Sequence, residues 1–483
     1  MQLRVIQRIL GLLLMVFSFT MLPPVVVGII YGDGALGAFL AGFAVTLVTG
    51  CLLWLPARRH VRELHLRDGF IVVVMFWSVL ALFGSLPFVW VSEPDMPFID
   101  ALFESMSGLT TTGATVITHI DPLPKALLFY RQELQWLGGM GIIVLAVAIL
   151  PMFGIGGMQL YRAETPGPMK DNKLTPRITE TAKALWYIYL GLTVACAVGY
   201  WAFGMSVFDA IGHSFSTVAI GGFSTHDASI GYFKSTAIES VAIVFMLLAG
   251  VNFALHFVAL RGLQPSVYWR DAEFRAYITV LLIVAVIACS YLYFNHTFDS
   301  VGGVLHHGIF QVISIGTTTG FTTADYHNWP GFLPALLLLL SFVGGCAGST
   351  GGGMKVIRVL LLIKQGMREI LRLIHPNAEI PVKVGSVCLS PRVIGSVWGF
   401  FALYVLSFCF MSLLLAATGL DLVTSFSAVA ACINNLGPGL GEVGFNYASI
   451  SATAKGILCF AMLLGRLEIF TLLVLLTPAF WRG

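Results

Sequence analysis

The chain is a succession of long apolar runs separated by short polar breaks, and ten of the runs are long enough to cross a bilayer, which takes about 20 helical residues. They lie near residues 6–31, 35–56, 70–91, 134–153, 184–203, 237–260, 276–294, 331–372 (interrupted), 394–418 and 455–478. Four shorter amphipathic stretches lie between them, near 98–110, 208–219, 304–317 and 422–434. Because these are too short to span the membrane, we expect re-entrant helices.

Each short stretch leads directly into a motif that crowds glycine against hydroxyl, amide or small apolar residues. The motifs are Thr110–Gly113, Ala219–Gly222, Thr317–Gly320 and Asn434–Gly437, and their final glycines are roughly 100 residues apart. Irregular backbone at membrane depth is tolerated only where it is buried in protein or lines a watery path. The pattern therefore predicts four diverged repeats around a single path.

The predicted fold is an all-α polytopic membrane protein with about ten transmembrane helices. Its core is four pseudo-symmetric repeats of helix, pore helix, filter loop and helix around one pore. The expected divisions are 1–69, an N-terminal helix pair with a basic cytoplasmic loop; 70–183, repeat 1; 184–275, repeat 2; 276–393, repeat 3 with a broken helix and gate loop; and 394–483, repeat 4.

Composition agrees with a membrane location, since 57% of residues are hydrophobic, 11% are charged and the mean hydropathy is +0.88. The net charge of +3 is too small to indicate a nucleic-acid partner. Nearly all lysines and arginines lie in the loops opposite the glycine motifs. By the positive-inside rule, both termini are expected to be cytoplasmic and the motifs to open outward. No serine, histidine and acid lie at a common depth, so the sequence gives no indication of an enzyme.

Four glycine loops in one ring have the chemistry of an ion filter. Backbone carbonyls held in rings replace the water around a desolvated cation, and glycine reaches backbone angles closed to other residues. Side chains need not touch the ion, which explains how different residue pairs precede the four glycines. Any one glycine is equally well explained by helix packing, but four in register favour the filter.

A second unusual segment, Gly344–Gly353, interrupts the eighth span. The apolar half before it, 332–343, is about 18 Å long as a helix and cannot cross a core of about 30 Å. Discontinuous helices mark sites or gates in transporters, so we expect a flexible plug beneath the filter. A nucleotide-binding loop is the alternative, but Gly-Lys-Ser/Thr is absent.

Arg466 lies about 16 Å into the last span, where a charge is costly unless it faces a cavity or a partner. Two interpretations remain open. Either it is a packed arginine bonded to carbonyls of neighbouring helices, or it is a fixed positive charge beside the ion path.

With these motifs the chain resembles the Trk/Ktr/HKT superfamily of potassium transporters over nearly its whole length. The resemblance rests on the N-terminal helix pair, the stretches 110–115, 221–226, 317–323 and 434–441, the glycine-rich break and Gly-Arg-Leu-Glu at 465–468. It implies K+ uptake across the bacterial inner membrane, with K+ as the transported ion and no bound organic cofactor. It also implies a homodimer in contact with membrane lipids, and a cytosolic nucleotide-binding regulatory subunit of the TrkA type.

The resemblance also assigns the site. The implied K+ ligands are the backbone carbonyls of Thr111, Thr112, Ile220, Gly221, Thr318, Thr319, Asn435 and Leu436, with filter glycines Gly113, Gly222, Gly320 and Gly437. The implied gate is formed by Gly345, Gly348, Ser349, Thr350, Gly351, Gly352, Gly353 and Arg466. In related plant proteins a serine at the first filter glycine accompanies Na+ selectivity, so four glycines favour K+. Ile220-Gly221 departs from the Thr-Thr pairs, so low to moderate selectivity is expected.

Two mechanisms remain open from the sequence. One is a gated, channel-like pathway driven by the membrane potential. The other is a symporter that couples K+ to H+ or Na+. The scarcity of acids within the predicted spans favours the pore, because a proton relay usually needs them.

Overall fold

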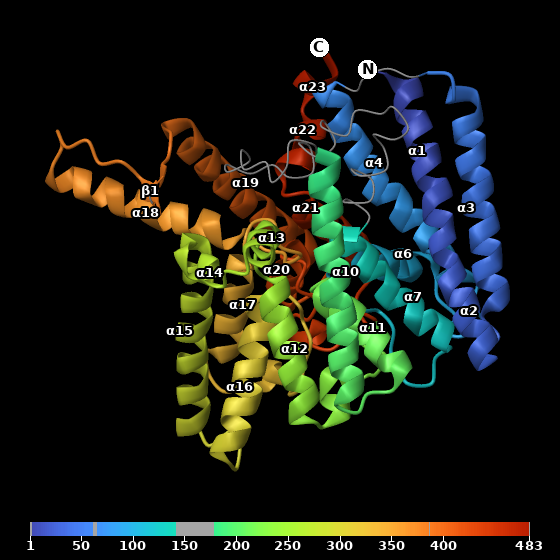
Figure 1. Ribbon diagram of the computed structural model, residues 1–483, viewed down its shortest axis with the longest axis horizontal. Coiled ribbons are helices and arrows are strands. Elements are labelled where there is room, and N and C mark those ends of the chain that lie inside the picture. The colour runs from blue at the N-terminus through green and yellow to red at the C-terminus, as the bar shows by residue number, and fades with distance from the viewer. Residues whose placement is uncertain (1, 61–64, 142–177, 386, 483) are drawn as a thin grey trace.

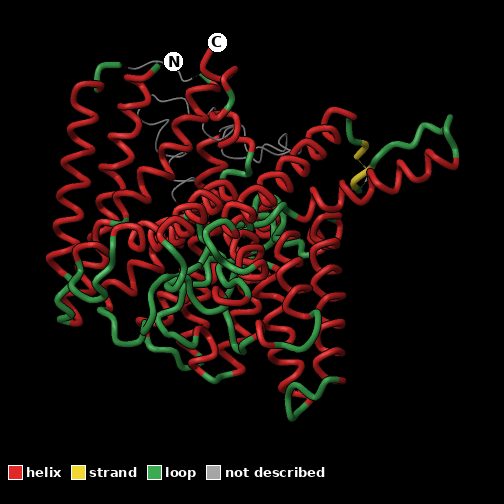
Figure 2. Tube along the Cα trace, turned by 180° about the vertical axis from the view of Figure 1, so that it is seen from behind, coloured by secondary structure: helices red, strands yellow, loops and turns green. Residues whose placement is uncertain are grey.

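The protein is represented by a computed structural model that describes residues 2–60, 65–141, 178–385 and 387–482. The described chain is helical almost throughout (Figures 1 and 2), which agrees with the predicted all-α polytopic fold. The one sheet among the described residues is a two-stranded antiparallel ladder, β1 (Lys383–Val384) with β2 (Val387–Cys388).

The N-terminal pair consists of α1 (Leu3–Ser18), a 3-10 turn η1 (Phe19–Met21) and α2 (Leu22–Tyr31), followed by α3 (Leu36–Ala57). A Cβ added at Gly11 or at Gly50 would lie closer than 3.0 Å to the backbone of the other helix. The helices α1 and α3 therefore approach through glycine, as is common between membrane helices.

The remaining helices are described in the order of the four predicted repeats, whose expected starts at 70, 184, 276 and 394 each lie a few residues inside a helix. Repeat 1 contains α4 (Leu66–Gly84), α5 (Leu86–Trp90), α6 (Phe98–Leu109), α7 (Lys125–Trp136) and the π-helical turn η2 (Leu137–Gly141). Repeat 2 contains α10 (Ile178–Ala202), α11 (Val207–Val218), the 3-10 turn η4 (Ser229–Phe233), α12 (Thr236–Ala249), α13 (Phe253–Gly262) and α14 (Ser266–Arg270). Most of the span predicted at 134–153 lies outside the described residues.

Repeat 3 contains α15 (Ala272–Phe294), α16 (Val301–Gly316), η5 (Tyr326–Asn328), α17 (Leu333–Val343) and α18 (Val356–Ile374). Repeat 4 contains α19 (Pro391–Ala416), α20 (Leu422–Ile433), η6 (Gly441–Val443), α21 (Ala452–Arg466), α22 (Phe470–Leu476) and α23 (Pro478–Arg482). Both termini lie at the same end of the molecule, and α18 projects sideways from its body (Figure 1).

Each of the four predicted short stretches forms a helix of 12 or 16 residues that ends at its glycine motif. Three begin at a side-chain cap, because Ser206, Ser300 and Asp421 accept hydrogen bonds from the first-turn amides of α11, α16 and α20. The fourth, α6, begins after Pro97. Local sequence therefore sets where each re-entrant helix starts, and the motif sets where it stops.

Within the described part of the chain, six helices are long and apolar enough to cross a membrane, and eight spans result if each of two bent pairs counts as one. Large apolar side chains such as Leu52, Leu282 and Leu413 are exposed on these helices. Such contiguous apolar exposure is expected of a surface that meets lipid rather than water.

Two spans expected to be continuous are instead sharply bent. The span near 237–260 breaks between α12 and α13 with a bend of 97°, and the span near 455–478 breaks after Arg466 with a bend of 118°. Asn252 starts the new helix at the first break, where its Oδ1 accepts from Ala254 N. Hydropathy alone did not reveal the breaks, because it averages Asn252 at the first break, and Arg466 and Glu468 at the second, with the apolar residues on either side.

Candidate functional site

The four glycine motifs form a closed ring. A Cβ added at Gly113 would lie closer than 3.0 Å to the carbonyl oxygen of Gly221 in the next repeat. The same holds for Gly222 against Thr319, Gly320 against Leu436 and Gly437 against Thr112. We number the four motifs filter strands 1 to 4 in chain order. The glycine of each strand therefore lies with its bare Cα against a carbonyl of the next strand, and the glycine of strand 4 lies against a carbonyl of strand 1.

The backbone of all four loops has the same unusual conformation. Every filter glycine has a positive φ, between 78° and 97°. Two residues before each glycine, Thr111, Ile220, Thr318 and Asn435 also have positive φ, between 52° and 69°. Such angles are strained for residues with a side chain and persist only where the surroundings fix them, often at functional sites.

Several side chains of the filter strands form hydrogen bonds with one another. In strand 1, the hydroxyls of Thr110 and Thr112 lie 2.7 Å apart, and in strand 3 those of Thr317 and Thr319 lie 2.8 Å apart. Asn435 Nδ2 donates to Thr112 Oγ1 at 3.0 Å and so joins strand 4 to strand 1. The side chains brace the ring, which fits ion coordination by backbone carbonyls.

An ion pair within the protein supports the first two loops. Arg131 Nε lies 2.7 Å from Glu104 Oε1, and both side chains are almost fully buried. Arg131 also donates to the carbonyl of Ser224 at 3.0 Å and to Thr115 Oγ1 at 3.1 Å. Glu104 Oε2 accepts from Val116 N at 3.1 Å. The pair therefore ties the loop after filter strand 1 to the loop after strand 2.

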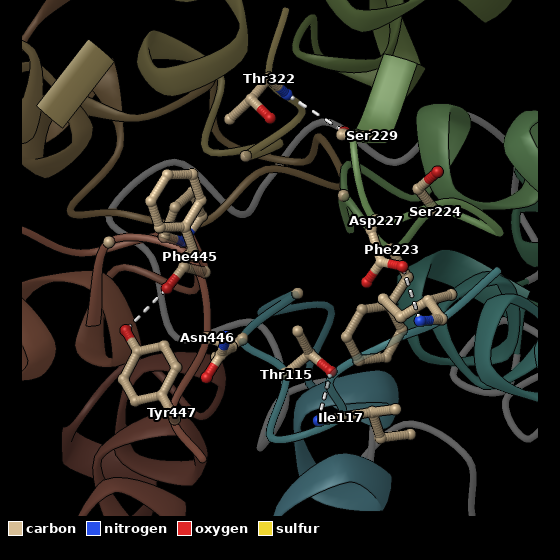
Figure 3. Close-up of a pocket in the computed structure, with 18 of the residues that line it drawn as sticks. Thr115, Ile117, Phe223, Ser224, Asp227, Ser229, Thr322, Phe445, Asn446 and Tyr447 are labelled. Atoms are coloured by element: carbon tan, nitrogen blue, oxygen red, sulfur yellow. Dashed lines mark hydrogen bonds between the residues drawn. The ribbon is translucent and has the colours of Figure 1, made fainter. Parts of the chain in front are cut away.

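A cavity of about 530 Å³ lies over the ring of glycines. All four loops line it, as Figure 3 shows with Thr115, Asp227, Thr322 and Tyr447 on successive sides. All four filter glycines belong to its lining, together with Asp227 and Asp325. The cavity, called the vestibule below, is thus common to all four loops, and its carboxylates favour a cation over an anion.

The wall of this vestibule includes a histidine held between two carboxylates. His226 Nδ1 lies 2.6 Å from Asp121 Oδ1, and its Nε2 lies 3.5 Å from Asp209 Oδ1. Its ring stacks on Tyr232 with centroids 3.5 Å apart. The hydrogen bonds and negative charges of both aspartates outweigh partial burial and raise the pKa of His226 above 6.5. The same contact lowers the pKa of Asp121.

On the other side of the ring, the segment 344–355 between α17 and α18 lies directly against the filter strands. Gly352 N donates to Thr318 Oγ1 at 2.7 Å, and Gly353 N donates to the carbonyl of Asn434 at 3.1 Å. Thr350 Oγ1 donates to the carbonyl of Val218 at 2.9 Å. The segment therefore contacts the inner ends of the second, third and fourth re-entrant helices. The predicted gate residues Gly345, Gly348, Ser349, Thr350, Gly351, Gly352 and Gly353 all lie in it.

The break between α12 and α13 receives this segment. Cys346 N donates to the carbonyl of Gly250 at 2.8 Å, and Phe253 N donates to the carbonyl of Gly348 at 3.0 Å. Glu273, near the start of α15, accepts from Ala347 N at 2.7 Å and from Ile357 N at 3.2 Å. The unwound backbone of one span thus forms hydrogen bonds with the unwound backbone of another, so that these backbone groups have partners at membrane depth.

Arg466 lies where these parts meet, at the end of α21. Its guanidinium donates to Thr111 Oγ1 at 3.0 Å, to the carbonyl of Thr350 at 3.4 Å and to the carbonyls of Gly138 and Gly139. Both sequence interpretations therefore apply, since Arg466 is bonded to carbonyls and is also beside the filter and the predicted gate. A charge in this position has its hydrogen bonds satisfied without a carboxylate partner among these contacts.

The structure brings together every predicted filter and gate residue, but sequence reasoning missed several that support them. The carbonyls of Gly138 and Gly139 accept from Arg466, a contact that the sequence did not indicate. Gln135 and Glu273 were not considered, and no role beside the motifs was assigned to Arg131. Only Gln135 lies within a predicted span, where a polar side chain indicates a buried partner without identifying it.

Comparison with known proteins shows likeness over the whole chain. The family described as TrkH, cation transport protein, matches residues 35–482. A Vibrio parahaemolyticus protein named Trk system potassium uptake protein TrkH is 59% identical, and the match covers all of both chains. An Escherichia coli protein of the same name is 56% identical over all of both chains, and one named TrkG is 44% identical over 99% of both. The crystal structure of the potassium transporter TrkH from Vibrio parahaemolyticus matches with a TM-score of 0.91 at 56% identity and covers all of both chains.

Breaking the buried ion pair is expected to destabilise the protein. Arg131→Met leaves Glu104 buried without its partner, which typically costs about 3–5 kcal/mol. The measurement is thermal unfolding in detergent, followed by tryptophan fluorescence. Arg372→Met is the control, because Arg372 and Glu369 form an exposed pair worth roughly 0–1 kcal/mol. Equal, small shifts for both variants would show that the Arg131 pair does not support the loops.

The histidine in the vestibule wall is expected to make stability depend on pH. Because the folded pKa of His226 is raised, its contribution is fully present below pH 6.5 and is lost as pH rises through the folded pKa. The difference in melting temperature between the native chain and His226→Gln should shrink from pH 6 toward pH 9. His119→Gln, at an exposed vestibule histidine, is the control. A difference that is constant with pH would exclude a charged His226 between Asp121 and Asp209.

Proposed function

Because the chain belongs to the TrkH family of cation transport proteins, we propose that it takes up potassium ions through a gated pore. The single observation that carries this proposal is the cyclic contact of each filter glycine with the carbonyl of the next strand. A cation on the axis of such a ring meets oxygen from four sides. Relatives that match the chain from end to end are named potassium uptake proteins.

The eight backbone carbonyls of Thr111, Thr112, Ile220, Gly221, Thr318, Thr319, Asn435 and Leu436 are the proposed K+ ligands. Support comes from the shared backbone conformation of the four strands and from the engagement of their side chains elsewhere. The four strands differ in sequence, so the ring is asymmetric. We therefore propose low to moderate selectivity for K+ over Na+.

The segment 344–355 and Arg466 form the proposed gate. The segment lies on the axis side of three re-entrant helices, and Arg466 connects it to the fourth through Thr111. Glycine at six of its positions allows the backbone to rearrange. Opening requires this segment to leave its hydrogen bonds with Thr318, Asn434 and Val218.

A pore driven by the membrane potential is favoured over a symporter. The potential supplies about 2.3 kcal/mol per charge per 100 mV, and the filter and gate described here need no second ion. The names of the relatives mention potassium uptake and no coupling ion. The reversal potential distinguishes the two mechanisms, because that of a symporter moves with the coupled ion.

The relatives' names refer to a Trk system, which implies a system of several components. We propose that the regulatory component is a cytosolic nucleotide-binding subunit of the TrkA type, and that the transporter is a homodimer in the bacterial inner membrane with both termini cytoplasmic. The basic stretch from Lys355 to Arg392 is the proposed docking surface, and its contact with anionic lipid is the alternative.

Replacement of the first filter glycine tests the proposed filter. Gly113→Ser puts a Cβ against the carbonyl of Gly221 at a φ of 78°, so strands 1 and 2 must separate. We expect K+ preference over Na+ to fall roughly tenfold, a change of about 1.4 kcal/mol. The measurement is K+ and Na+ uptake in cells that lack their own potassium uptake systems.

The control for this experiment is Gly34→Ser, since Gly34 also has positive φ but has open space around its Cα. Restored growth on low K+ by the native chain and by Gly34→Ser, but not by Gly113→Ser, supports the proposal. A native chain that moves no K+ contradicts it.

Replacement of Arg466 tests the gate, because its planar guanidinium is a fork of several hydrogen-bond donors. Arg466→Gln loses charge-assisted hydrogen bonds to Thr111, Thr350, Gly138 and Gly139, which are worth roughly 1.5–3 kcal/mol each. We expect Rb+ flux into liposomes without the regulatory component to rise roughly tenfold or more. Arg466→Lys keeps the charge without the fork and should give an intermediate rate. Unchanged flux in both variants would remove Arg466 from the gate.

A further inference from the structure

Filter strand 2 lacks the internal support that strands 1 and 3 have. The residue just before each filter glycine supplies the ring carbonyl, which is the carbonyl in contact with the neighbouring strand's glycine. In strands 1 and 3 the hydroxyl of this residue bonds to the hydroxyl of the residue two positions earlier, in the pairs Thr110–Thr112 and Thr317–Thr319. The matching residues of strand 2 are Ala219 and Gly221, which have no hydroxyl. Strand 2 therefore needs its support from outside the motif.

Helix α7 of repeat 1 supplies that support with side chains. Gln135 Nε2 donates to the carbonyl of Gly221 at 2.6 Å, and Gln135 Oε1 accepts from Phe223 N at 3.0 Å. Gln132 Nε2 donates to the carbonyl of Phe223 at 3.3 Å. Both ends of the Gln135 amide thus bond to the strand, in the manner of a neighbouring β-strand, which also fixes the orientation of the amide.

The same side chain explains why residue 221 is glycine. A Cβ added at Gly221 would lie closer than 3.0 Å to Cγ, Cδ and Oε1 of Gln135. Gly221 is not among the residues with positive φ, so its backbone does not itself require glycine. Threonine and leucine occupy the matching positions Thr112, Thr319 and Leu436. Gln135, which is fully buried, fills the space that a side chain would take.

The contact reaches a ring carbonyl. In the described part of the chain, the carbonyl of Gly221 accepts a side-chain hydrogen bond, whereas none is found on the carbonyls of Thr112, Thr319 and Leu436. An amide that holds this oxygen fixes the width of the ring at this strand. The amide of Gln135 and the ion then both draw on the electron density of the Gly221 oxygen.

We propose that Gln135 is a positioning residue that sets the cation preference of the filter by holding the Gly221 carbonyl in the ring. The inference rests on the proposed function, and it adds a residue from outside the four glycine motifs. Without Gln135, strand 2 can close on an ion smaller than K+, and the distinction between K+ and Na+ weakens.

The test compares two glutamines on one face of α7. Gln135→Met keeps an unbranched side chain of similar length but loses both hydrogen bonds, and Gln132→Met is the matched control because its bond goes to Phe223 and not to a ring carbonyl. Purified transporter in liposomes is assayed for uptake of K+, Rb+ and Na+. We expect Gln135→Met to lower the K+ to Na+ uptake ratio roughly fivefold while K+ uptake persists, and Gln132→Met to change it less than roughly twofold.

A double replacement tests the shared space. Gly221→Thr alone should abolish or strongly reduce uptake, since the threonine meets Gln135, and Gln135→Ala with Gly221→Thr should restore K+ uptake with a cation preference different from the native one. Tolerance of Gly221→Thr while Gln135 is present overturns the proposal, as does an unchanged ratio in Gln135→Met or an equal change in Gln132→Met. If the native chain moves no K+, the proposed function itself fails, which this design separates from failure of the inference.

Discussion

The close approach of four backbone strands at their glycines is the constraint on which the rest of the structure depends. The space that a Cβ at each filter glycine would need is taken by a carbonyl of the next strand. A ring this tight leaves no room for side chains on its inner face. Support must therefore come from the outer side of the ring, and three kinds are found: hydroxyl pairs in strands 1 and 3, Gln135 for strand 2, and the buried Asn434 and Asn435 in strand 4.

The breaks in the spans follow from the same ring. The re-entrant helices end at membrane depth, so their last carbonyls need donors. The segment 344–355 provides two of them, because Thr350 Oγ1 donates to the carbonyl of Val218 and Gly353 N donates to the carbonyl of Asn434. To do so it must itself be unwound, and its own backbone groups bond at the break after α12 and to Glu273. One irregular segment beneath the filter therefore requires irregular partners around it.

The sequence predicted the parts of this arrangement that leave a local signature. Re-entrant helices are short and amphipathic, and Gly113, Gly222, Gly320 and Gly437 each follow one, so the ring was visible from spacing alone. The bends after Ala249 and Arg466 were not, because hydropathy averages over a break of a few residues. Gln135 and Arg131 were missed for another reason: their importance lies in contacts with residues about 90 positions away, which no local pattern encodes.

Building the ring from one chain has a physical consequence that four identical subunits would not permit. In a symmetric ring, an arginine at the filter would appear four times, and four buried positive charges would repel the cation and each other. Here Arg466 bonds to Thr111 of strand 1, and no symmetry repeats it in the other strands. Likewise the segment 344–355 contacts the strands on their inner side, where four copies of this segment would occupy the same space on the axis. Divergence of the four repeats is thus what allows a ring built from fourfold contacts to have one segment, the proposed gate, against its inner side.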